Sequence, residues 1–490
     1  MTVGTGETLQ LKKQERNKGI LIMIYAPNAI VKKDGKFIFS GNVSAKAHAS
    51  LIKPIIAEFW NGFCFHMSTL HATETDELVF AVGEADMPST DGKAYAINVE
   101  PSGIRVVADD KKGLMLGLMT LMDRIETYDT EAGVELKIDC FELKESPAIK
   151  NRIAHMCVFP EVELWEIQKF LRLCAALRYS HVIVEFWGMM KYDCLDALSW
   201  KNAYAKDEIR PIFEEARDLG LELIPMFNCW GHAAACRASF GKHVVLNQRP
   251  ELQYLFTDSG WSWNIYSPKA KELLRKIRDE LIDLCGEGEY FHVGCDESYC
   301  YDLKDKQVMD DVCDYINEMS AELTAKGRRA IVWGDMFLYK YPEYKSKAAY
   351  AYACFSPSPE SEQYMLAKLD KNIVIGNWQY CSVEAPVETT PVLVKAGLDN
   401  IICGWDRGEA NTKACIDAAK EHNLAGYMHT TWDTLDSGTW YLALAGVKCF
   451  DGDVIGNRMT QTASLLRKVY FTDGDYLRSG WRRRDVSNRL

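Results

Sequence analysis

The sequence predicts an α/β protein in which a (β/α)8 TIM barrel follows a small α+β domain. Two observations lead to this prediction. From residue 151 onward, eight short apolar runs alternate with stretches of helical spacing, and they fall within about 280 residues, close to the ~250 that such a barrel takes. Four of the last runs end on tryptophan.

The predicted barrel strands are short and apolar. In chain order they are Arg152–Val158, His181–Phe186, Leu221–Phe227, Tyr290–Gly294, Arg329–Trp333, Asn372–Trp378, Asn400–Trp405 and Gly426–Trp432. The clearest helices between them are Leu164–Leu177, Asp207–Leu219, Lys269–Leu284 and Val308–Ala325. A doubly wound α/β sheet is the competing architecture, but no glycine-rich phosphate-binding loop follows the first strand.

The chain before the barrel has a different pattern. It contains strand-like runs at Ile20–Tyr25, Leu78–Val82, Ala94–Val99 and Ile104–Ala108, and helical spacing at Ala45–Trp60 and Gly113–Glu126. We therefore expect a small non-catalytic α+β domain over residues 1–147 and the catalytic barrel over residues 148–450. Residues 451–490 are expected to form a helix and tail that pack on the barrel.

Composition excludes several classes of protein. Hydrophobic residues make up 48% of the 490, enough for a large core, and the net charge of −12 argues against nucleic acid or anionic membranes as partners. The 16 cysteines are scattered without a CxxC pair. The first residues are polar, without the apolar core of a signal peptide, and the run Ile20–Tyr25 is far too short to cross a membrane. We expect free thiols and a cytoplasmic location.

In TIM barrels the reactive residues lie at the carboxyl ends of the strands. Here those ends carry several carboxylates and tryptophans and an arginine. The residues at them are Arg152, His155, Glu185, Trp187, Asn228, His232, His292, Asp296, Glu297, Trp333, Asp335, Trp378, Tyr380, Trp405, Asp406, Trp432 and Asp433. Aromatic faces stack on the C–H faces of sugars while charged groups hold hydroxyls, so this composition favours a carbohydrate site.

The sharpest local signal is His292-Val293-Gly294-Cys295-Asp296-Glu297. Neighbouring side chains alternate in an extended strand, so both carboxylates reach one ligand only if the chain bends there. Two close carboxylates would raise one pKa and favour a protonated acid at neutral pH. The alternative is that Asp296 caps the next helix and Glu297 is solvated. The position directly after His-x-Gly at the fourth strand favours the catalytic interpretation.

This motif resembles the His-x-Gly-Gly-Asp-Glu signature of the family 20 glycoside hydrolases, the β-N-acetylhexosaminidases. Trp230-Gly231-His232 resembles the family's Pro-Gly-His element after the third strand, and the stretch from Ala94 to Leu121 resembles the small domain before its barrel. Arg152 resembles the first-strand arginine that holds the outer sugar hydroxyls. Three tryptophans fall where the family walls its acetamido pocket: Trp333, Trp378 and Trp432.

The resemblance implies a retaining exo-β-N-acetylhexosaminidase that works by substrate-assisted catalysis, without metal or cofactor. The substrate's own acetamido oxygen would attack the anomeric carbon and give an oxazolinium ion. Asp296 would orient and stabilise the acetamido N–H, and Glu297 would be the general acid and then the general base. His232 and His292 would support this pair. The substrate would be a small oligosaccharide or glycoconjugate, and a homodimer is left open.

The chain also departs from the family pattern. The seventh strand ends Cys403-Gly404-Trp405-Asp406, so Asp406 matches but the family's carbonyl-binding tyrosine is absent, and Tyr380 is the candidate substitute. Asp433 stands where the family has glutamate, and Cys295 replaces the second glycine, a small change. These differences surround the outer hydroxyls, so the sequence does not choose between terminal β-linked GlcNAc and GalNAc.

Three other functions are weighed against this one. A two-carboxylate β-glycosidase could pair Glu297 with Glu185 on sugars without an acetamido group. A metal-dependent hydrolase could use His155, His232, His292 and Asp296, although no His-x-His follows the first strand. The third is a non-catalytic sugar-binding barrel, against which the intact Asp296–Glu297 pair argues.

Overall fold

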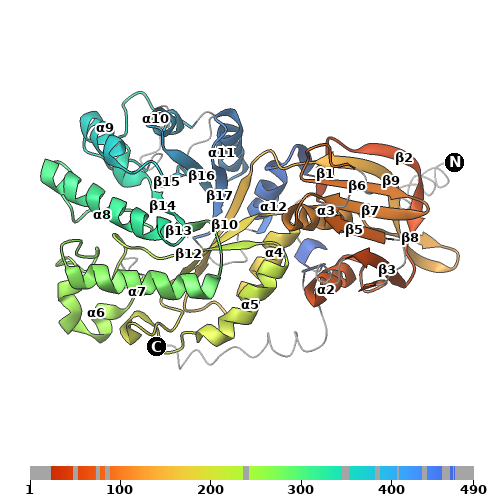
Figure 1. The fold of residues 1–490 in the computed structure, drawn as a ribbon, viewed down its shortest axis with the longest axis horizontal. Helices are drawn as coiled ribbons and strands as arrows, with labels where there is room; N and C mark the ends of the chain where they lie inside the picture. Colours follow the sequence, from red (N-terminus) through yellow and green to blue (C-terminus); the bar gives the residue numbers. More distant parts are fainter. Residues whose placement is uncertain are drawn as a thin grey trace, which may run out of the picture. The chain divides into compact units, whose positions relative to one another are not determined.

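The computed structural model describes residues 24–47, 53–72, 78–82, 89–234, 242–344, 353–380, 387–405, 408–432, 439–454, 464–466 and 468–469. These residues form two compact units (Figure 1). One contains the described residues up to Pro147 and those from Phe450 onward, and the other extends from Ala148 to Cys449.

The second unit is a closed barrel of eight parallel strands, each hydrogen-bonded to the next, with the last strand pairing back onto the first. The strands are β10 (Asn151–Val158), β11 (His181–Phe186), β12 (Glu222–Met226), β13 (Tyr290–His292), β14 (Arg329–Trp333), β15 (Val374–Trp378), β16 (Asp399–Trp405) and β17 (Gly426–Thr430). The predicted fold class is confirmed, and each predicted barrel strand is present.

Helices follow the strands as the sequence pattern indicated (Figure 1). They are α4 (Leu164–Ala176), α5 (Lys206–Asp218), α6 (Val245–Gln248), α7 (Pro268–Cys285), α8 (Lys306–Thr324), α9 (Pro359–Lys368), α10 (Thr390–Lys395), α11 (Glu409–Glu421) and α12 (Thr439–Lys448). Helix α7 begins where Ser267 accepts a hydrogen bond from the Ala270 N–H and Pro268 occupies the first turn. No helix within the described ranges is long and apolar enough to span a membrane.

The interior of the barrel is filled by one residue in two from each strand, because alternate side chains point inward. The apolar part of this core contains Ile153, Ile183, Ile224, Met226, Tyr290, Ile331, Val374, Ile401, Cys403 and Met428. Toward the carboxyl ends of the strands, the inward positions become aromatic or charged. The barrel thus supplies a rigid apolar base on which polar side chains are placed.

The first unit is built on a mixed β-sheet with the strand order β2-β9-β6-β7-β5-β3-β4, and β8 pairs with β9. The strands are β2 (Val31–Ile38), β3 (Asn42–Ala47), β4 (Thr69–Ala72), β5 (Leu78–Val82), β6 (Tyr95–Glu100), β7 (Gly103–Ala108), β8 (Glu126–Thr130) and β9 (Gly133–Glu145). Helix α3 (Lys111–Asp123) packs on β6 and β7, where Gly117 lets it approach Tyr95 and Val106 closely.

Two expectations for this unit need correction. The predicted helix Ala45–Trp60 is wrong at its start: residues 45–47 end β3, and helix α2 (Pro54–Phe63) begins at Pro54, which favours a first helical turn. β18 (Gly452–Val454) pairs with β1 (Tyr25–Pro27), because β1 offers an unpaired edge. The described residues after Phe450 therefore belong to this unit, whereas we expected them on the barrel.

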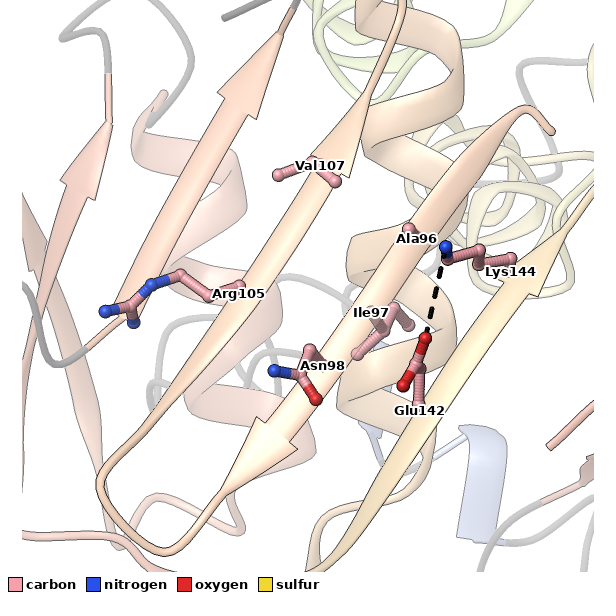
Figure 2. A pocket seen from close by; sticks show the side chains of 7 residues that line it. All are labelled: Ala96, Ile97, Asn98, Arg105, Val107, Glu142 and Lys144. Carbon is pink, nitrogen blue, oxygen red and sulfur yellow. Dashed lines mark ion pairs between the residues drawn. The ribbon is translucent and has the colours of Figure 1, made fainter. Parts of the chain in front are cut away.

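A cavity of about 180 Å³ lies on the sheet of the first unit (Figure 2). It is lined by Ala96, Ile97, Asn98, Arg105, Val107, Glu142 and Lys144, from β6, β7 and β9. Lys144 and Glu142, which lie next to each other on β9, form an ion pair at 4.0 Å. All of its lining residues belong to the first unit, so it is no part of the barrel's polar end.

Candidate active site

The segment after β13 turns sharply, as the neighbouring carboxylates required. Gly294, Cys295 and Glu297 have positive φ angles of 66°, 77° and 47°. The turn brings both carboxylates to one side chain: the Nε2 atom of His232 lies 3.3 Å from Asp296 Oδ2 and 3.1 Å from Glu297 Oε2. A single imidazole therefore contacts both members of the predicted catalytic pair.

Residues from the neighbouring strands hold this turn in place. Asn228, after β12, accepts a hydrogen bond from the Cys295 N–H at 2.8 Å and donates one to Asp296 Oδ1 at 2.9 Å. On the other side, the Glu297 N–H donates to Asp335 Oδ2 at 2.9 Å. A left-handed backbone costs a residue with a Cβ roughly 1–2 kcal/mol, and these bonds offset that cost.

Glycines make the close packing of this turn feasible. A Cβ on Gly294 would lie 1.5 Å from Asn228 Oδ1, and a Cβ on Gly231 would lie 2.0 Å from the Asp296 carbonyl oxygen. Cys295, where the resembled signature has glycine, adopts φ 77° with a buried thiol. The replacement keeps the turn, but in a backbone conformation that favours glycine.

Burial and charge set distinct protonation states within this group. Burial alone would lower the pKa of His232, but the charge of Asp296 and hydrogen bonds to both carboxylates raise it to about 9. Burial opposes ionisation of Asp296, yet His232, Lys242 and Asn228 hold its pKa below the ordinary value. Burial and the charge of Asp296 raise the pKa of Asp335 well above its ordinary value. At neutral pH this arrangement favours an imidazolium, an ionised Asp296 and a protonated Asp335.

Aromatic side chains from four strands meet beside this group. Ring centroids are 5.2 Å apart for Trp378 and Tyr380, 5.2 Å for Tyr380 and Trp405, and 6.1 Å for Trp333 and Trp432. The Trp432 indole N–H donates to the Tyr380 hydroxyl at 2.8 Å. The Trp378 indole N–H donates to Asp335 Oδ1 at 3.2 Å, which ties these rings to the carboxylate turn. We call these five residues the aromatic box.

Two buried features support the base of the aromatic box. A Cβ on Gly376 would lie 2.8 Å from the Trp333 ring, so glycine leaves the space that this indole fills. His292 packs against Trp333 with centroids 4.3 Å apart, and its Nδ1 accepts the Gly294 N–H at 3.0 Å. Burial lowers the pKa of His292 to about 3, so it is neutral. Its position fits the supporting role predicted for it.

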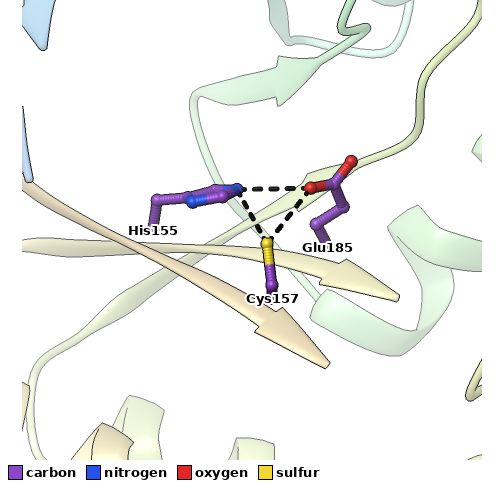
Figure 3. Close-up of side chains that lie close together, drawn as sticks. All are labelled: His155, Cys157 and Glu185. Atoms are coloured by element: carbon purple, nitrogen blue, oxygen red, sulfur yellow. Dashed lines mark hydrogen bonds and ion pairs between the residues drawn. The ribbon is translucent and has the colours of Figure 1, made fainter. Parts of the chain in front are cut away.

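A second charged group lies at the ends of β10 and β11 (Figure 3). Glu185 Oε2 lies 3.4 Å from His155 Nε2 and 3.5 Å from the Cys157 thiol, and it accepts the Trp187 indole N–H at 3.2 Å. Its other oxygen pairs with the Lys242 ammonium. That ammonium lies over the rings of Trp187 and Trp432, 5.0 and 5.3 Å from their centroids. Lys242 thus borders the aromatic box.

Comparison with known proteins gives the family. Residues 187–433, half of the chain, match the family model for the glycosyl hydrolase family 20 catalytic domain. The chain belongs to glycosyl hydrolase family 20. The family match covers every barrel strand after β11 and ends one residue beyond Trp432.

Individual family 20 relatives are distant. Lacto-N-biosidase of Bifidobacterium bifidum is 22% identical over 264 residues, which cover 50% of this chain but only 22% of that protein. A β-hexosaminidase of Akkermansia muciniphila is 20% identical over 353 residues, which cover 64% of this chain and 69% of that protein. The solved β-N-acetylhexosaminidase of Bacteroides fragilis has a TM-score of 0.65 at 18% identity, covering 89% of this chain and 92% of that one. This last likeness shows the fold alone.

Arg152 does not lie at the site of this family 20 barrel. It is the second residue of β10, at the amino end of the strand, whereas the site is at the carboxyl end. Its guanidinium donates to the carbonyl oxygens of Arg178 at 2.8 Å, Ile149 at 3.0 Å and Lys150 at 2.7 Å. The prediction that Arg152 holds sugar hydroxyls is wrong, because the side chain is fastened to backbone at the opposite end.

The metal-dependent alternative receives little support from the donor chemistry. In the described part of the chain, the group with metal-ligand spacing is His155, Cys157 and Glu185, without His232, His292 or Asp296. Burial and the charge of Glu185 raise the pKa of the Cys157 thiol well above its ordinary value. Burial opposes the charge of Glu185, but Lys242 and His155 hold its pKa well below the ordinary value. Glu185 is therefore an ionised carboxylate that accepts hydrogen bonds from His155 and from a protonated Cys157 thiol, and a protonated thiol is not a metal ligand.

Some residues lie outside the prediction or outside the described structure. Asp406 and Asp433, predicted to bind substrate, fall outside the described residues. Asn228 and Asp335 were among the polar residues expected at the strand ends, but the sequence assigned them no role, and the structure places both at the carboxylate turn. Lys242 was not among them, since it comes from the long connection after β12.

Proposed function

We propose that this protein is a retaining exo-β-N-acetylhexosaminidase, which removes a terminal β-linked GlcNAc or GalNAc by substrate-assisted catalysis. The observation that carries the proposal is the contact of His232 with both Asp296 and Glu297, beside an aromatic box. Membership of family 20 and the β-hexosaminidase of Akkermansia muciniphila among the relatives support it.

In the first step, the acetamido oxygen of the bound sugar attacks the anomeric carbon, and the bond to the leaving oxygen breaks. Glu297 gives its proton to that oxygen, so the leaving group departs as a neutral alcohol. The ring that forms is an oxazolinium cation. Asp296 is already ionised and accepts the acetamido N–H, so its negative charge stabilises the developing positive charge.

In the second step, water attacks the anomeric carbon from the face that the leaving group left. Glu297, now a carboxylate, takes a proton from this water as the bond forms, and the oxazolinium ring opens to restore the acetamido group. Two inversions give net retention. His232 contacts both carboxylates, and we assign it the role of holding their separation while the charge on Glu297 changes.

The aromatic box would fold the acetamido group back toward the anomeric carbon. Trp333, Trp378 and Trp432 offer rigid walls, which lowers the entropy lost in reaching the attacking geometry. The Tyr380 hydroxyl accepts a hydrogen bond from Trp432, and its own proton is then available to the acetamido carbonyl oxygen. We therefore assign Tyr380 the carbonyl-binding role.

Lys242 takes over the function that we expected of Arg152. Within the described part of the chain, Glu185 is its single hydrogen-bond acceptor, although an ammonium carries three N–H donors. Burial lowers the pKa of Lys242, but Glu185 and Asp296 raise it above the ordinary value, so it stays charged. The remaining N–H groups, beside Trp432, suit the outer hydroxyl oxygens of the terminal sugar.

The decisive experiment is hydrolysis of aryl β-GlcNAc, β-GalNAc, β-glucoside and β-galactoside by the purified protein, with and without a thiazoline mimic of the oxazoline. Cleavage confined to the N-acetylated sugars and inhibited by the thiazoline is the expected result. The ratio of the two N-acetylated substrates would fix the preference between them. Cleavage of the plain glycosides without thiazoline inhibition would favour the two-carboxylate mechanism instead.

We also propose that the enzyme acts in the cytoplasm on small oligosaccharides or glycoconjugates. All 14 cysteines among the described residues are free, which suits a reducing compartment. Immunodetection in fractionated cells would test this location, and recovery of the protein outside the cytoplasmic fraction would contradict it.

A further inference from the structure

Two aromatic side chains beside the carboxylate turn are exposed. Tyr299 keeps 55% and Phe355 keeps 37% of its surface in solvent. Their rings meet edge to face, with centroids 5.3 Å apart and planes at 86°. Large aromatic rings in solvent contribute little to a core, and a paired set of them is a feature of binding surfaces.

Backbone hydrogen bonds tie both residues to the site. The Tyr299 N–H donates to the Glu297 carbonyl oxygen at 3.0 Å, and the Phe355 N–H donates to the Asp335 carbonyl oxygen at 2.7 Å. Asp335 in turn accepts the Glu297 N–H. The main chain at both residues is therefore held near Glu297, and their rings meet although they come from loops more than fifty residues apart.

The exposure of Glu297 indicates which part of a bound substrate would lie beside these rings. Its side chain is 30% exposed, compared with 10% for Asp296, so Glu297 is the member of the pair that opens to solvent. Burial and the neighbouring Glu297 carboxylate raise the pKa of the Tyr299 hydroxyl above its ordinary value. In the proposed reaction, that carboxyl group touches the oxygen of the bond being broken. The Tyr299 ring therefore lies where the leaving group must extend.

We propose that Tyr299 and Phe355 form a platform that binds the first residue of the leaving group, and that this residue is a sugar ring. The assignment rests on the proposed hydrolase function and deepens it. Perpendicular rings form a corner with one open aromatic face and one ring edge, which suits a flat, rigid ring with a C–H face and outward hydroxyls. A sugar keeps those hydroxyls hydrated beside the exposed rings. The natural substrate is then an oligosaccharide.

Three glycosides of N-acetylglucosamine test the platform: the β-linked disaccharide, the octyl glycoside and the methyl glycoside. All three have poor leaving groups that need the proton from Glu297, but only the first has a ring beyond the scissile bond. The measurement is the ratio of kcat/KM between the disaccharide and the methyl glycoside. Using a ratio cancels any general disturbance of Glu297, which would slow both substrates equally.

For Phe355→Ala we expect this ratio to fall about tenfold, the effect of losing one apolar contact to a substrate. Tyr299→Phe, which keeps the ring, should keep the ratio, whereas Tyr299→Ala should lower it. Tyr254→Ala is the matched control, because Tyr254 is also an exposed aromatic residue (49%), and among the described residues its ring contacts Lys269, not the catalytic turn. Its ratio should equal that of the wild type.

The outcomes separate the two proposals. An unchanged ratio in Phe355→Ala and Tyr299→Ala would overturn the platform while leaving the hydrolase intact. A larger loss for the octyl glycoside than for the disaccharide would overturn the sugar assignment in favour of an alkyl chain. Folded wild-type protein that cleaves none of the three would overturn the hydrolase function itself, and the platform with it.

Discussion

The carboxyl and amino ends of the barrel use buried charge differently. At the carboxyl end, His232 is shared by Asp296 and Glu297, and Lys242 has one carboxylate acceptor among the described residues. At the amino end, the Arg152 guanidinium donates to three backbone carbonyl oxygens. Backbone partners are present whether or not a ligand is bound, so such a charge serves the fold. A charged group that is shared between two partners, such as His232, or that keeps unused N–H donors, such as Lys242, is instead suited to a ligand.

Among substitutions at the two ends of the barrel, Glu297→Gln is expected to lower kcat/KM the most. On the disaccharide, loss of the general acid should lower kcat/KM by about 10³–10⁴-fold. An activated aryl glycoside needs no proton on its leaving group for the first step, so its loss should be much smaller. Steady-state kinetics on both substrates measure the difference. Equal losses would mean that Glu297 is not the proton donor.

Asp296→Asn should follow, with a loss of about 10²–10³-fold on the disaccharide and the activated aryl glycoside alike. The reason is that Asp296 stabilises the oxazolinium ion, which forms with either leaving group. The same two assays apply, after thermal unfolding has established that the variant is folded. Selective loss on the disaccharide would reverse the roles of the two carboxylates.

His232 should make the free energy of unfolding depend on pH. Its pKa is about 9 in the folded chain, above the ~6.5 expected when unfolded, so its contribution to stability is fully present below pH 6.5. As pH rises from 6.5 to 9, the free energy of unfolding should fall by about 3 kcal/mol. Urea unfolding across this range measures it. In His232→Gln the fall should largely vanish, and an undiminished fall would assign it to other groups.

Lys242→Met should lower kcat/KM by roughly ten- to a hundredfold, the usual cost of losing a hydrogen bond from a charged group. The single variant leaves the buried Glu185 carboxylate without its counter-ion and should also lose about 3–5 kcal/mol of stability. Lys242→Met with Glu185→Gln removes both charges and is the better test of binding. Full activity in that folded double variant would exclude a substrate contact.

Arg152→Met should have the smallest effect on catalysis. Because the side chain lies at the amino end, kcat/KM per folded molecule should change by no more than about twofold, while stability falls by about 2–3 kcal/mol through the carbonyl groups left unpaired. Kinetics and urea unfolding on the same preparation separate these effects. A large loss of kcat/KM at unchanged stability would show that the charge at the amino end also serves catalysis, and the difference between the two ends would not hold.

The barrel could be predicted because each strand is an apolar run bounded by polar residues or glycine. The run from Tyr290 shows where this reasoning stops: it was expected to extend to Gly294, but β13 ends at His292 because Gly294 and Cys295 turn left-handed. In the first unit, β9 was missed, since its apolar residues alternate with charged ones such as Lys137 and Asp139. Pairing with three other strands stabilises it there.

The site could be predicted where function follows a strand end, and not where it depends on distant contacts. Asp296, Glu297 and the tryptophans lie at strand ends and come together as expected. Arg152 was assigned from its resemblance to the family's first-strand arginine, without regard to which end of that strand it occupies. Lys242 and Glu185 meet although 57 residues separate them, and no spacing rule links a long loop to a strand.

The turn after β13 depends on Asn228 and Asp335, which belong to the two flanking strand ends. During refolding, its left-handed backbone has no partners until β12, β13 and β14 are aligned. Hydrolytic activity should therefore return later than helical circular dichroism, and an enzyme assay reports on strand registry. A chain cut between Asn228 and Asp335 would have to reassociate correctly before any substrate is turned over.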